Sequence, residues 1–325
     1  MSSILTNMSA MSALQNLAST QKNLSSVQSQ ISTGLKVASA SDNAAYWSIS
    51  TSMKSDTSAL SAVSNALNLG SSVVSTATSA MSSVTTILKQ LKADLVTAQT
   101  TGASRTQVQS DISAQQSSLR NIIASASFNQ VNLLDGSTST TNVVSSFART
   151  ADGNDLGTIG IDTTNIALAG GSSATSGAGL LGSSLSLTNL SGSAGNTTSY
   201  TTSSNGTSTA ASGYYASDSL LAFNISGSGV TSSDLSQLSS AIDAAITSVT
   251  SAAAQLGTYT TTINNQLTFV SALSDAISSG VGSLVDADMN EASTRLNAMQ
   301  TQQQLGVQAL SIANQNSQLI LKLFQ

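Results

Sequence analysis

Proline, cysteine and histidine are all absent from this 325-residue chain. Proline breaks a helix interior at a cost of about 3 kcal/mol, so its absence is compatible with long uninterrupted helices. A chain without cysteine forms neither a disulfide nor a thiolate site. Without histidine or cysteine the usual general base and the best nucleophile are also missing. A serine–lysine or two-carboxylate site is not excluded, but no spacing suggests one, so we expect a protein that is not an enzyme and has no cofactor.

Charged and aromatic residues are scarce, at 8% and 3% of the chain, whereas 40% of it is hydrophobic. An average soluble domain carries about 25% charged residues. Here Ala, Leu, Val and Ile provide the apolar area, which suits narrow seams between helices. Small polar faces suit close packing against other copies, although they could also be no more than an unusual surface composition. A net charge of −5 argues against a nucleic-acid partner, because phosphate binding needs a basic stripe.

The chain also lacks a long apolar run. No continuous stretch of about 18 apolar residues occurs, so we expect no membrane span. The first basic residue is Lys22, and the residues before it mix Ser, Asn and Gln with apolar ones, which is not the pattern of a cleaved secretory signal. If the protein leaves the cell, we expect it to do so by another route.

What the chain has instead is two long apolar stripes with alternating steps of four and three residues, the spacing of a supercoiled helix seam. Only Asp56 and Gly70 are out of type in the first stripe. The pattern predicts two long helices that pair, and it favours assembly over catalysis. The first stripe comprises Ile49, Met53, Leu60, Val63, Leu67, Val74, Ala77, Met81, Val84, Leu88, Leu91 and Leu95. The second comprises Leu235, Leu238, Ile242, Ile246, Val249, Leu256, Ile263, Leu267, Val270, Ile277, Val281 and Leu284.

The two ends of the chain carry further stripes. The N-terminal one is followed by Gly34, a helix stop, and then by Ser41 or Asp42 as the N-cap of the next helix. Tyr46 and Trp47 beside this turn could anchor it against a neighbouring molecule or pack locally. The C-terminal segment carries two adjacent stripes, and because one partner helix covers only one, the other needs a further neighbour. We predict these interface residues: Ile4, Met8, Met11, Leu14, Leu17, Leu24, Val27, Ile31, Leu296, Met299, Leu305, Leu310, Ile312, Leu319, Ile320, Leu323 and Phe324.

Between the long stripes the composition changes. The Thr101-Gly-Ala-Ser stretch predicts a turn, followed by a helix from about Arg105. From Asp135-Gly136 the chain is rich in Ser, Thr and Gly as far as about residue 233, which predicts either a small β-rich domain or loosely ordered loops. The third helix would present one apolar face: Val108, Ile112, Leu119 and Ile122. Candidate strand residues are Val143, Phe147, Ile159, Ile161, Ile166, Leu185, Leu187, Phe223 and Ile225.

Two short motifs have an ordinary alternative. Gly177-Ala-Gly-Leu-Leu-Gly182 matches a dinucleotide-binding pattern but has no convincing strand before it or helix after it, so we interpret it as a chance match. Asp286-Ala-Asp-Met-Asn-Glu291 resembles the start of a calcium loop. Glu291 stands where the sharp turn needs glycine, so we favour acidic residues in the first turn of a helix, and we predict no metal site.

Three stretches together resemble bacterial flagellin. The first is Gln30-Ile-Ser-Thr-Gly-Leu-Lys-Val-Ala-Ser-Ala-Ser-Asp-Asn-Ala-Ala45, and the second is Phe128-Asn-Gln-Val-Asn-Leu-Leu134. The third contains Gln302-Gln-Gln-Leu-Gly and Ala309-Leu-Ser-Ile-Ala-Asn-Gln. The resemblance covers about residues 1–135 and 235–325 and is nearest to the rhizobial, alphaproteobacterial type.

The resemblance implies a mainly α fold in which long helices from both chain ends form antiparallel coiled coils around a β-rich or irregular insertion. It implies a subunit of the extracellular flagellar filament that is exported unfolded by the flagellar type III apparatus. The expected partners are other copies of the chain, other flagellins, the filament cap, hook-junction proteins and an export chaperone. A hook–filament junction protein and a coiled-coil signalling module are alternatives, but the second would need a membrane span or a sensor.

With this resemblance we divide the chain into five parts. They are a filament-core helix at 1–40, rod helices at 41–134, a variable surface-exposed domain at 135–234, a rod helix at 235–284 and a second filament-core helix at 285–325. The first 35 residues can bury too few side chains to offset the entropy of ordering them. We therefore expect the terminal helices to fold when neighbouring copies cover them.

Overall fold

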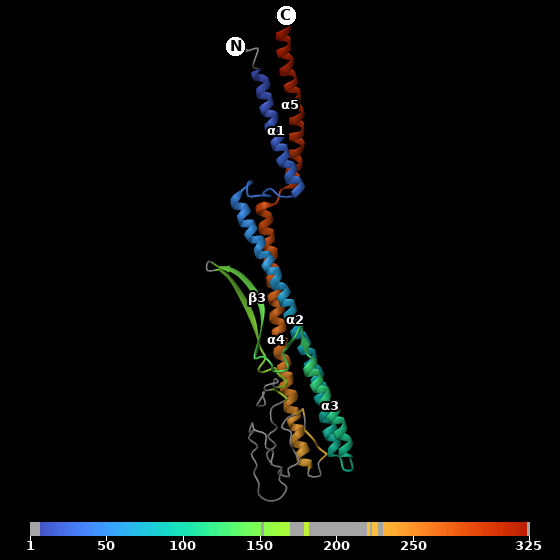
Figure 1. Ribbon diagram of the computed structural model, residues 1–325. Helices are drawn as coiled ribbons and strands as arrows, with labels where there is room; N and C mark the ends of the chain where they lie inside the picture. Colours follow the sequence, from blue (N-terminus) through green and yellow to red (C-terminus); the bar gives the residue numbers. More distant parts are fainter. Residues whose placement is uncertain are drawn as a thin grey trace. The chain divides into compact units, whose positions relative to one another are not determined.

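The computed structural model describes residues 7–150, 153–169, 179–181, 220–221, 223–226 and 230–323. The described chain is mainly α-helical, as predicted, with a small amount of antiparallel sheet in its middle (Figure 1). It forms two compact units, one of Met1–Ala59 with Leu273–Gln325 and one of Leu60–Ala272. The elements in chain order are α1 (Met8–Thr33), α2 (Ala44–Gln99), α3 (Arg105–Ser125), β1 (Ser127–Phe128), β2 (Val131–Asn132), β3 (Thr140–Thr150), β4 (Gly153–Asp162), α4 (Ser232–Val285) and α5 (Met289–Leu323).

Helices α2 and α4 lie side by side and antiparallel, and their apolar stripes form the seam (Figure 1). Lys92 of α2 forms an ion pair with Asp243 of α4, with 2.6 Å between Nζ and Oδ1. Within the other unit, a methyl group added at Gly280 of α4 would lie 3.3 Å from Met53 Cε of α2. From Leu60 to Leu95 every apolar residue of the predicted stripe is at most 4% exposed. The heptad prediction is therefore confirmed over this part of α2, because these side chains are excluded from water by the partner helices.

The start of α2 differs from the sequence prediction. Helix α2 begins at Ala44, and the Asn43 side chain caps it by accepting a hydrogen bond from the Tyr46 amide at 3.1 Å. Asp42 instead accepts hydrogen bonds from the amides of Ala38 and Ser39, so neither Ser41 nor Asp42 is the cap. The prediction was wrong by one or two positions because three adjacent residues all have cap-forming side chains. Three large apolar residues of this first stretch are exposed, Tyr46, Trp47 and Ile49, the last of which the stripe had placed in the seam.

Helix α3 follows the predicted turn and returns along the same unit. Gly102 adopts the left-handed conformation (φ 91°), and the Ser104 hydroxyl caps α3 by accepting a hydrogen bond from the Gln107 amide. On the predicted apolar face Ile112 and Leu119 are fully buried. The third large buried residue is Ile123, whereas Ile122 is only partly buried. At that turn it is position 123 that faces the packed side of the helix.

Polar side chains of α3 hold the chain segment that leads back into α4. Gln116 Nε2 donates to the Phe223 carbonyl at 3.1 Å, and Gln109 Oε1 accepts from the Ile225 amide at 2.7 Å. Arg120 donates to the Leu221 carbonyl at 2.9 Å. Because these bonds reach backbone groups, they fix the path of the segment largely independently of its side chains.

Two β-hairpins follow α3. Strands β1 and β2 are joined by Asn129 and Gln130, which both have positive φ (48° and 66°), as a tight two-residue turn requires. Strands β3 and β4 form a longer antiparallel ribbon with an irregularity between Val144 and Ser146.

The candidate strand residues divide into three groups. Val143, Phe147, Ile159 and Ile161 do lie in β3 and β4. Ile166, Phe223 and Ile225 are buried but lie outside strands. Leu185 and Leu187 lie outside the described residues, as do Gly177 and Gly182 of the glycine motif.

The β3–β4 ribbon packs directly on the long helices. Val143 of β3 lies over Gly70 of α2, and a methyl group added at Gly70 would be 2.6 Å from Val143 Cγ1. Gln266 of α4 donates a hydrogen bond to the Ser145 carbonyl at 2.9 Å. Gly70, which had seemed a defect in the stripe, is therefore a position where the absence of a side chain lets the ribbon approach the helix closely.

Candidate assembly surface

Backbone hydrogen bonds between residues from opposite ends of the chain join α1 and α5 at their base. Gly34 ends α1 in the left-handed conformation (φ 72°), as its position predicted, and its carbonyl accepts a hydrogen bond from the Ala287 amide at 2.9 Å. The Val285 carbonyl accepts hydrogen bonds from the amides of Lys36 and Val37, at 2.6 and 3.2 Å. A small apolar cluster lies beside these bonds and comprises Val37, Val281, Val285, Leu35, Met53, Ile277 and Leu284. We call this region the junction.

Beyond the junction, α1 and α5 pair along an antiparallel seam (Figure 1). Asn7 at the start of α1 donates a hydrogen bond to the Ala313 carbonyl at 2.9 Å. At Gly306 the two helices approach closely, because an added methyl group would lie 3.0 Å from Leu17 Cδ1. The partly or fully buried residues that line the seam are Ala10, Ala13, Leu17, Thr20, Leu24, Val27 and Ile31 on α1, and Ala292, Leu296, Met299, Gln303, Gly306, Leu310 and Ala313 on α5.

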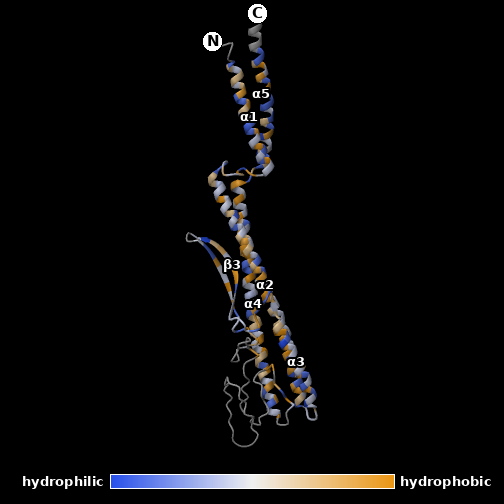
Figure 2. Ribbon diagram, in the orientation of Figure 1, coloured by the Kyte–Doolittle hydropathy of each residue, from blue (hydrophilic) through white to orange (hydrophobic). Residues whose placement is uncertain are grey.

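A second set of apolar side chains on the same two helices is left in water. Hydrophobic and hydrophilic segments alternate along both α1 and α5 (Figure 2). Six large apolar side chains there are more than half exposed: Met8 (71%), Met11 (58%), Leu14 (57%), Leu305 (58%), Val307 (55%) and Ile312 (61%). We call these six residues the arm surface. Large apolar side chains left exposed on both helices of a pair are the kind of surface that a partner covers.

The predicted interface residues fall into distinct groups. The exposed ones are Met8, Met11, Leu14, Leu305 and Ile312. Those that line the internal seam are Leu17, Leu24, Val27, Ile31, Leu296, Met299 and Leu310. Ile4 and Phe324 lie outside the described residues, and α5 continues through Leu319, Ile320 and Leu323, whose side chains are not among those described.

The single N-terminal stripe therefore divides into two faces. At the start of α1 the side chains facing α5 are Ala10 and Ala13, whereas Met8 and Met11 are exposed. Sequence reasoning counted the large residues and passed over the alanines that allow the helices to approach. It also missed Val307, which belongs to neither C-terminal stripe. On α5 the predicted double stripe has the expected form, because one stripe packs on α1 and Leu305 and Ile312 of the other are exposed.

The acidic residues at the start of α5 satisfy the first turn of the helix, as we had favoured over a calcium loop. Asp288 Oδ1 accepts hydrogen bonds from the amides of Asn290 and Glu291, at 2.8 and 3.3 Å. Glu291 forms an ion pair with Arg295 one turn on, at 2.8 Å. These carboxylates therefore cap and support the helix.

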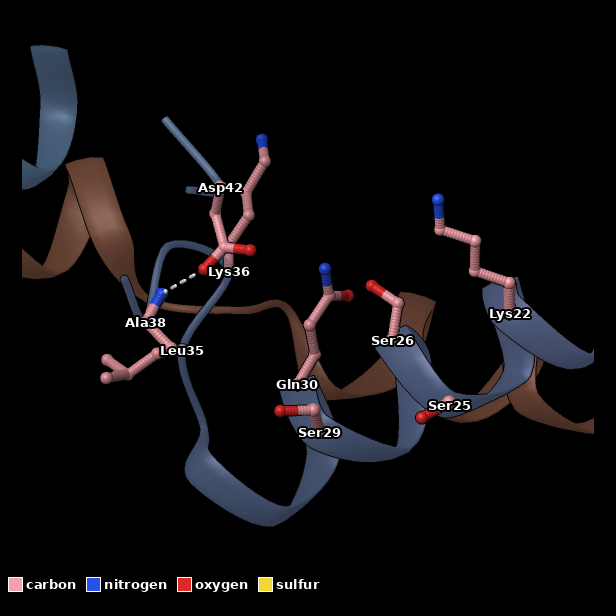
Figure 3. Close-up of a pocket in the computed structure, with 9 residues that line it drawn as sticks. All are labelled: Lys22, Ser25, Ser26, Ser29, Gln30, Leu35, Lys36, Ala38 and Asp42. Carbon is pink, nitrogen blue, oxygen red and sulfur yellow. Dashed lines mark hydrogen bonds between the residues drawn. The ribbon is translucent and has the colours of Figure 1, made fainter. Parts of the chain in front are cut away.

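A polar hollow of about 310 Å³ lies between the last turns of α1 and the loop that follows it (Figure 3). Figure 3 shows the Asp42 carboxylate turned toward the Ala38 amide. The hydrogen bonds from the Ser39 amide and hydroxyl, and then that from Ala38, lower the pKa of Asp42 below its ordinary value of 3.8. The lining residues are Lys22, Ser25, Ser26, Ser29, Gln30, Leu35, Lys36, Ala38 and Asp42.

The lowered pKa of Asp42 predicts an acid-sensitive loop. The carboxylate contributes stability at pH values above 3.8, and this contribution is lost as the pH falls through the lower pKa of the folded state. We expect hydrogen exchange at the Ala38 and Ser39 amides to lose protection over that acid range. Mass spectrometry of exchange in peptides covering residues 36–45 measures this. Asp42→Asn, which does not titrate, should show no such step, and an identical pH profile in that variant would contradict the assignment.

One helix among the described residues, α4, is long and apolar enough to cross a membrane by length and composition alone, with a mean hydropathy of 1.2 over its most apolar 18 residues. Of that window 17% is buried, and elsewhere the same helix carries the stripe with Leu235, Ile242 and Val249 fully buried. A helix whose apolar residues follow a heptad seam meets the membrane criterion without entering a bilayer. The absence of a membrane span remains a prediction.

Comparison with known proteins gives matches at both ends of the chain. The family model of the bacterial flagellin N-terminal helical region matches residues 4–139, and that of the C-terminal helical region matches residues 239–324. Flagellin C of Rhizobium meliloti (strain 1021) is 40% identical over 331 residues. The flagellin of Brucella melitensis biotype 1 is 38% identical over 337 residues, and flagellin FljK of Caulobacter vibrioides is 33% identical over 328. These alignments cover 100% of this chain and 99–100% of each relative.

Proposed function

This chain belongs to the bacterial flagellin family, and from that membership we propose that the arm surface is where its copies join. The protein is a structural subunit of the flagellar filament, which lies outside the cell, and it is not an enzyme. It assembles with other copies of itself. The question that the structure addresses is which of its residues make that assembly favourable.

The observation that carries the proposal is the exposure of six large apolar side chains on α1 and α5. Full burial of an exposed side chain of this size contributes about 1.5–3 kcal/mol, and these six, at 55–71% exposed, have more than half of that still to gain. The internal seam leaves them uncovered, so a lone copy cannot obtain this gain. Contact with neighbouring copies obtains it for all six. The predicted interface residues that line the seam have a supporting role in this proposal, since they hold α1 and α5 (the two arms) together.

We also propose that the arms complete their folding during assembly. In the described part of α1 only Leu24 and Val27 are buried, whereas the helix has 26 residues to order. Folding coupled to association is the expected behaviour of a segment that cannot bury enough apolar area alone. It would also keep both ends of the chain extended during export.

Seeded growth tests the proposal. Purified protein added to short filament seeds should lengthen them, as seen by electron microscopy and by sedimentation. Deleting residues 1–33, or residues 289–325, should leave a soluble monomer that does not lengthen seeds, because each deletion removes half of the arm surface. Circular dichroism should still show the helices of the remaining unit. Filament growth by either truncated chain would refute the role of the arms.

The remaining expectations are part of the same proposal. We propose secretion through the flagellar export apparatus with the help of a chaperone, and contacts with the filament cap, the hook-junction proteins and other flagellins. The five-part division at residues 40, 134, 234 and 284 is likewise proposed. The junction supports the first and last of these boundaries. Its backbone hydrogen bonds involve residues 34–37, between α1 and α2, and residues 285–287, at the end of α4 and before α5.

A further inference from the structure

Two of the methionines of this chain, Met8 and Met11, belong to the arm surface. The chain has 7 methionines and no cysteine, so methionine thioethers are its only sulfur groups. Among the described methionines, Met81 is fully buried in the α2 seam and Met289 is 44% exposed. Met8 and Met11 are the most exposed, at 71% and 58%. They stand three residues apart on α1, which makes them neighbours on the helix surface.

We propose that Met8 and Met11 form an oxidation-sensitive modification site that a two-electron oxidant such as hydrogen peroxide reaches in the unassembled subunit and that neighbouring copies shield in the filament. In the reaction a lone pair of the thioether sulfur attacks one peroxide oxygen and the O–O bond breaks. A sulfur–oxygen bond forms, the proton of the attacked oxygen passes through solvent to the other oxygen, and that oxygen leaves as water. The sulfur loses two electrons and the peroxide gains them. This inference rests on the proposed role of the arm surface.

Oxidation converts an apolar side chain of the arm surface into a polar one. A thioether is apolar and polarisable, whereas a sulfoxide is a strong hydrogen-bond acceptor. Residues 8–21 of α1 carry no charged side chain. A sulfoxide at Met8 or Met11 would therefore lose its water when a neighbouring copy covers it, without gaining a charged partner from its own helix. The two residues are neighbours on the surface of α1, so a copy that packs against this part of the helix would contact both sulfoxides.

The same exposure makes the rate of methionine oxidation depend on whether the subunit is free or assembled. In the free subunit both thioethers are accessible to a small oxidant. In the filament, covered thioethers should react slowly. Methionine sulfoxide is also the reversible step of methionine oxidation, since reductases return it to the thioether. Subunits would thus be sensitive before assembly and protected afterwards.

Two measurements on the full-length chain test this. Monomer and filament are treated with hydrogen peroxide, and peptide mass spectrometry then gives the oxidation rate of each methionine. We expect Met8 and Met11 to react at least about tenfold more slowly in the filament, and Met81 to react slowly in both states. Equal rates at Met8 and Met11 in monomer and filament would overturn the inference.

Seeded growth of the treated monomer is the second measurement. We expect peroxide to slow growth by about tenfold or more, the effect of one unpartnered polar group at an interface, and a methionine sulfoxide reductase to restore it. The double variant Met8→Leu, Met11→Leu should grow normally and keep growing after peroxide. The matched variant Met81→Leu should be as sensitive as the wild type. Loss of growth in the double variant after peroxide, to the same extent as in the wild type, would refute the site.

A separate variant distinguishes this inference from the proposed function. Leu14→Asp disrupts the arm surface without sulfur chemistry. If that variant grows like the wild type, the arm surface is not the contact between copies, and both proposals fail. If Leu14→Asp stops growth while peroxide-treated wild type grows normally, the arm surface stands and only the oxidation site is refuted.

Discussion

Replacing Ile312 by aspartate is expected to abolish filament growth while leaving the monomer soluble and helical. Ile312 is 61% exposed on α5, so the free chain accommodates a carboxylate there. In an assembled filament the same carboxylate would be covered by a neighbouring copy, and an unpaired buried charge costs several kcal/mol. Filament growth is measured as the mass of protein that sediments with the seeds, and circular dichroism reports the helix content of the monomer.

Asn297→Asp is the matched control for this variant. Asn297 is exposed on α5 and lies about 12 Å along the helix before Leu305, so the same charge is added away from the arm surface. We expect that variant to lengthen seeds. Leu310→Asp should also stop growth, but by another route, because Leu310 lines the seam with α1 and its loss should reduce the helix content of the arms. Normal growth of Ile312→Asp would show that this stripe faces solvent in the filament.

Gly70→Ala is expected to destabilise the unit formed by Leu60–Ala272, although alanine is the better helix former. The new methyl group would lie 2.6 and 2.8 Å from the two Val143 methyl carbons, distances at which β3 must move away from α2. Overpacking of this kind costs about 1–3 kcal/mol. The gain in helix propensity from glycine to alanine is about 1 kcal/mol. Urea unfolding followed by circular dichroism should therefore give a lower midpoint for the variant.

Removing the opposing methyl groups should reverse the effect. In the double variant Gly70→Ala, Val143→Ala the nearest atom that remains is the residue 143 Cβ, at 3.3 Å from the new methyl group. We expect the double variant to be more stable than the sum of the two single changes predicts, which a double-mutant cycle measures. Gly257→Ala is a control, because an added methyl group at that helical position meets no atom within 4 Å. A Gly70→Ala variant stabilised as much as Gly257→Ala would contradict the close approach of the ribbon.

The long helices could be predicted because their signal repeats many times. From Leu60 to Leu95 ten apolar residues keep the four–three spacing, and all ten are buried. The helix stop at Gly34 and the turn at Thr101-Gly-Ala-Ser were both predicted because glycine at a helix end readily adopts the left-handed conformation, which Gly34 and Gly102 do adopt. Local chemistry and long periodicity agree at these positions.

What the sequence could not predict depends on neighbours that are distant in the chain. Nothing local distinguishes Asn43 from Asp42 as the cap of α2, since the choice depends on the bonds that Asp42 makes with Ala38 and Ser39. The meaning of Gly70 depends on Val143, a residue of a later strand. The division of the arm residues depends on which face of α1 meets α5. Periodicity identifies an apolar face, but it does not say which of two partners will cover it.

Side-chain size is graded along the seam between α1 and α5. Near the junction the α1 side contributes Leu24 and Val27, which are at most 8% exposed, and toward the chain ends it contributes Ala10 and Ala13, which are only partly buried. Cohesion between the helices therefore declines with distance from Gly34. Thermal opening of the α1–α5 pair should begin around Ala10 and Ala13 and stop before Leu24 and Val27, so an arriving subunit would keep the pair closed at the junction while the Ala10–Ala13 stretch adjusts to the copies already in the filament.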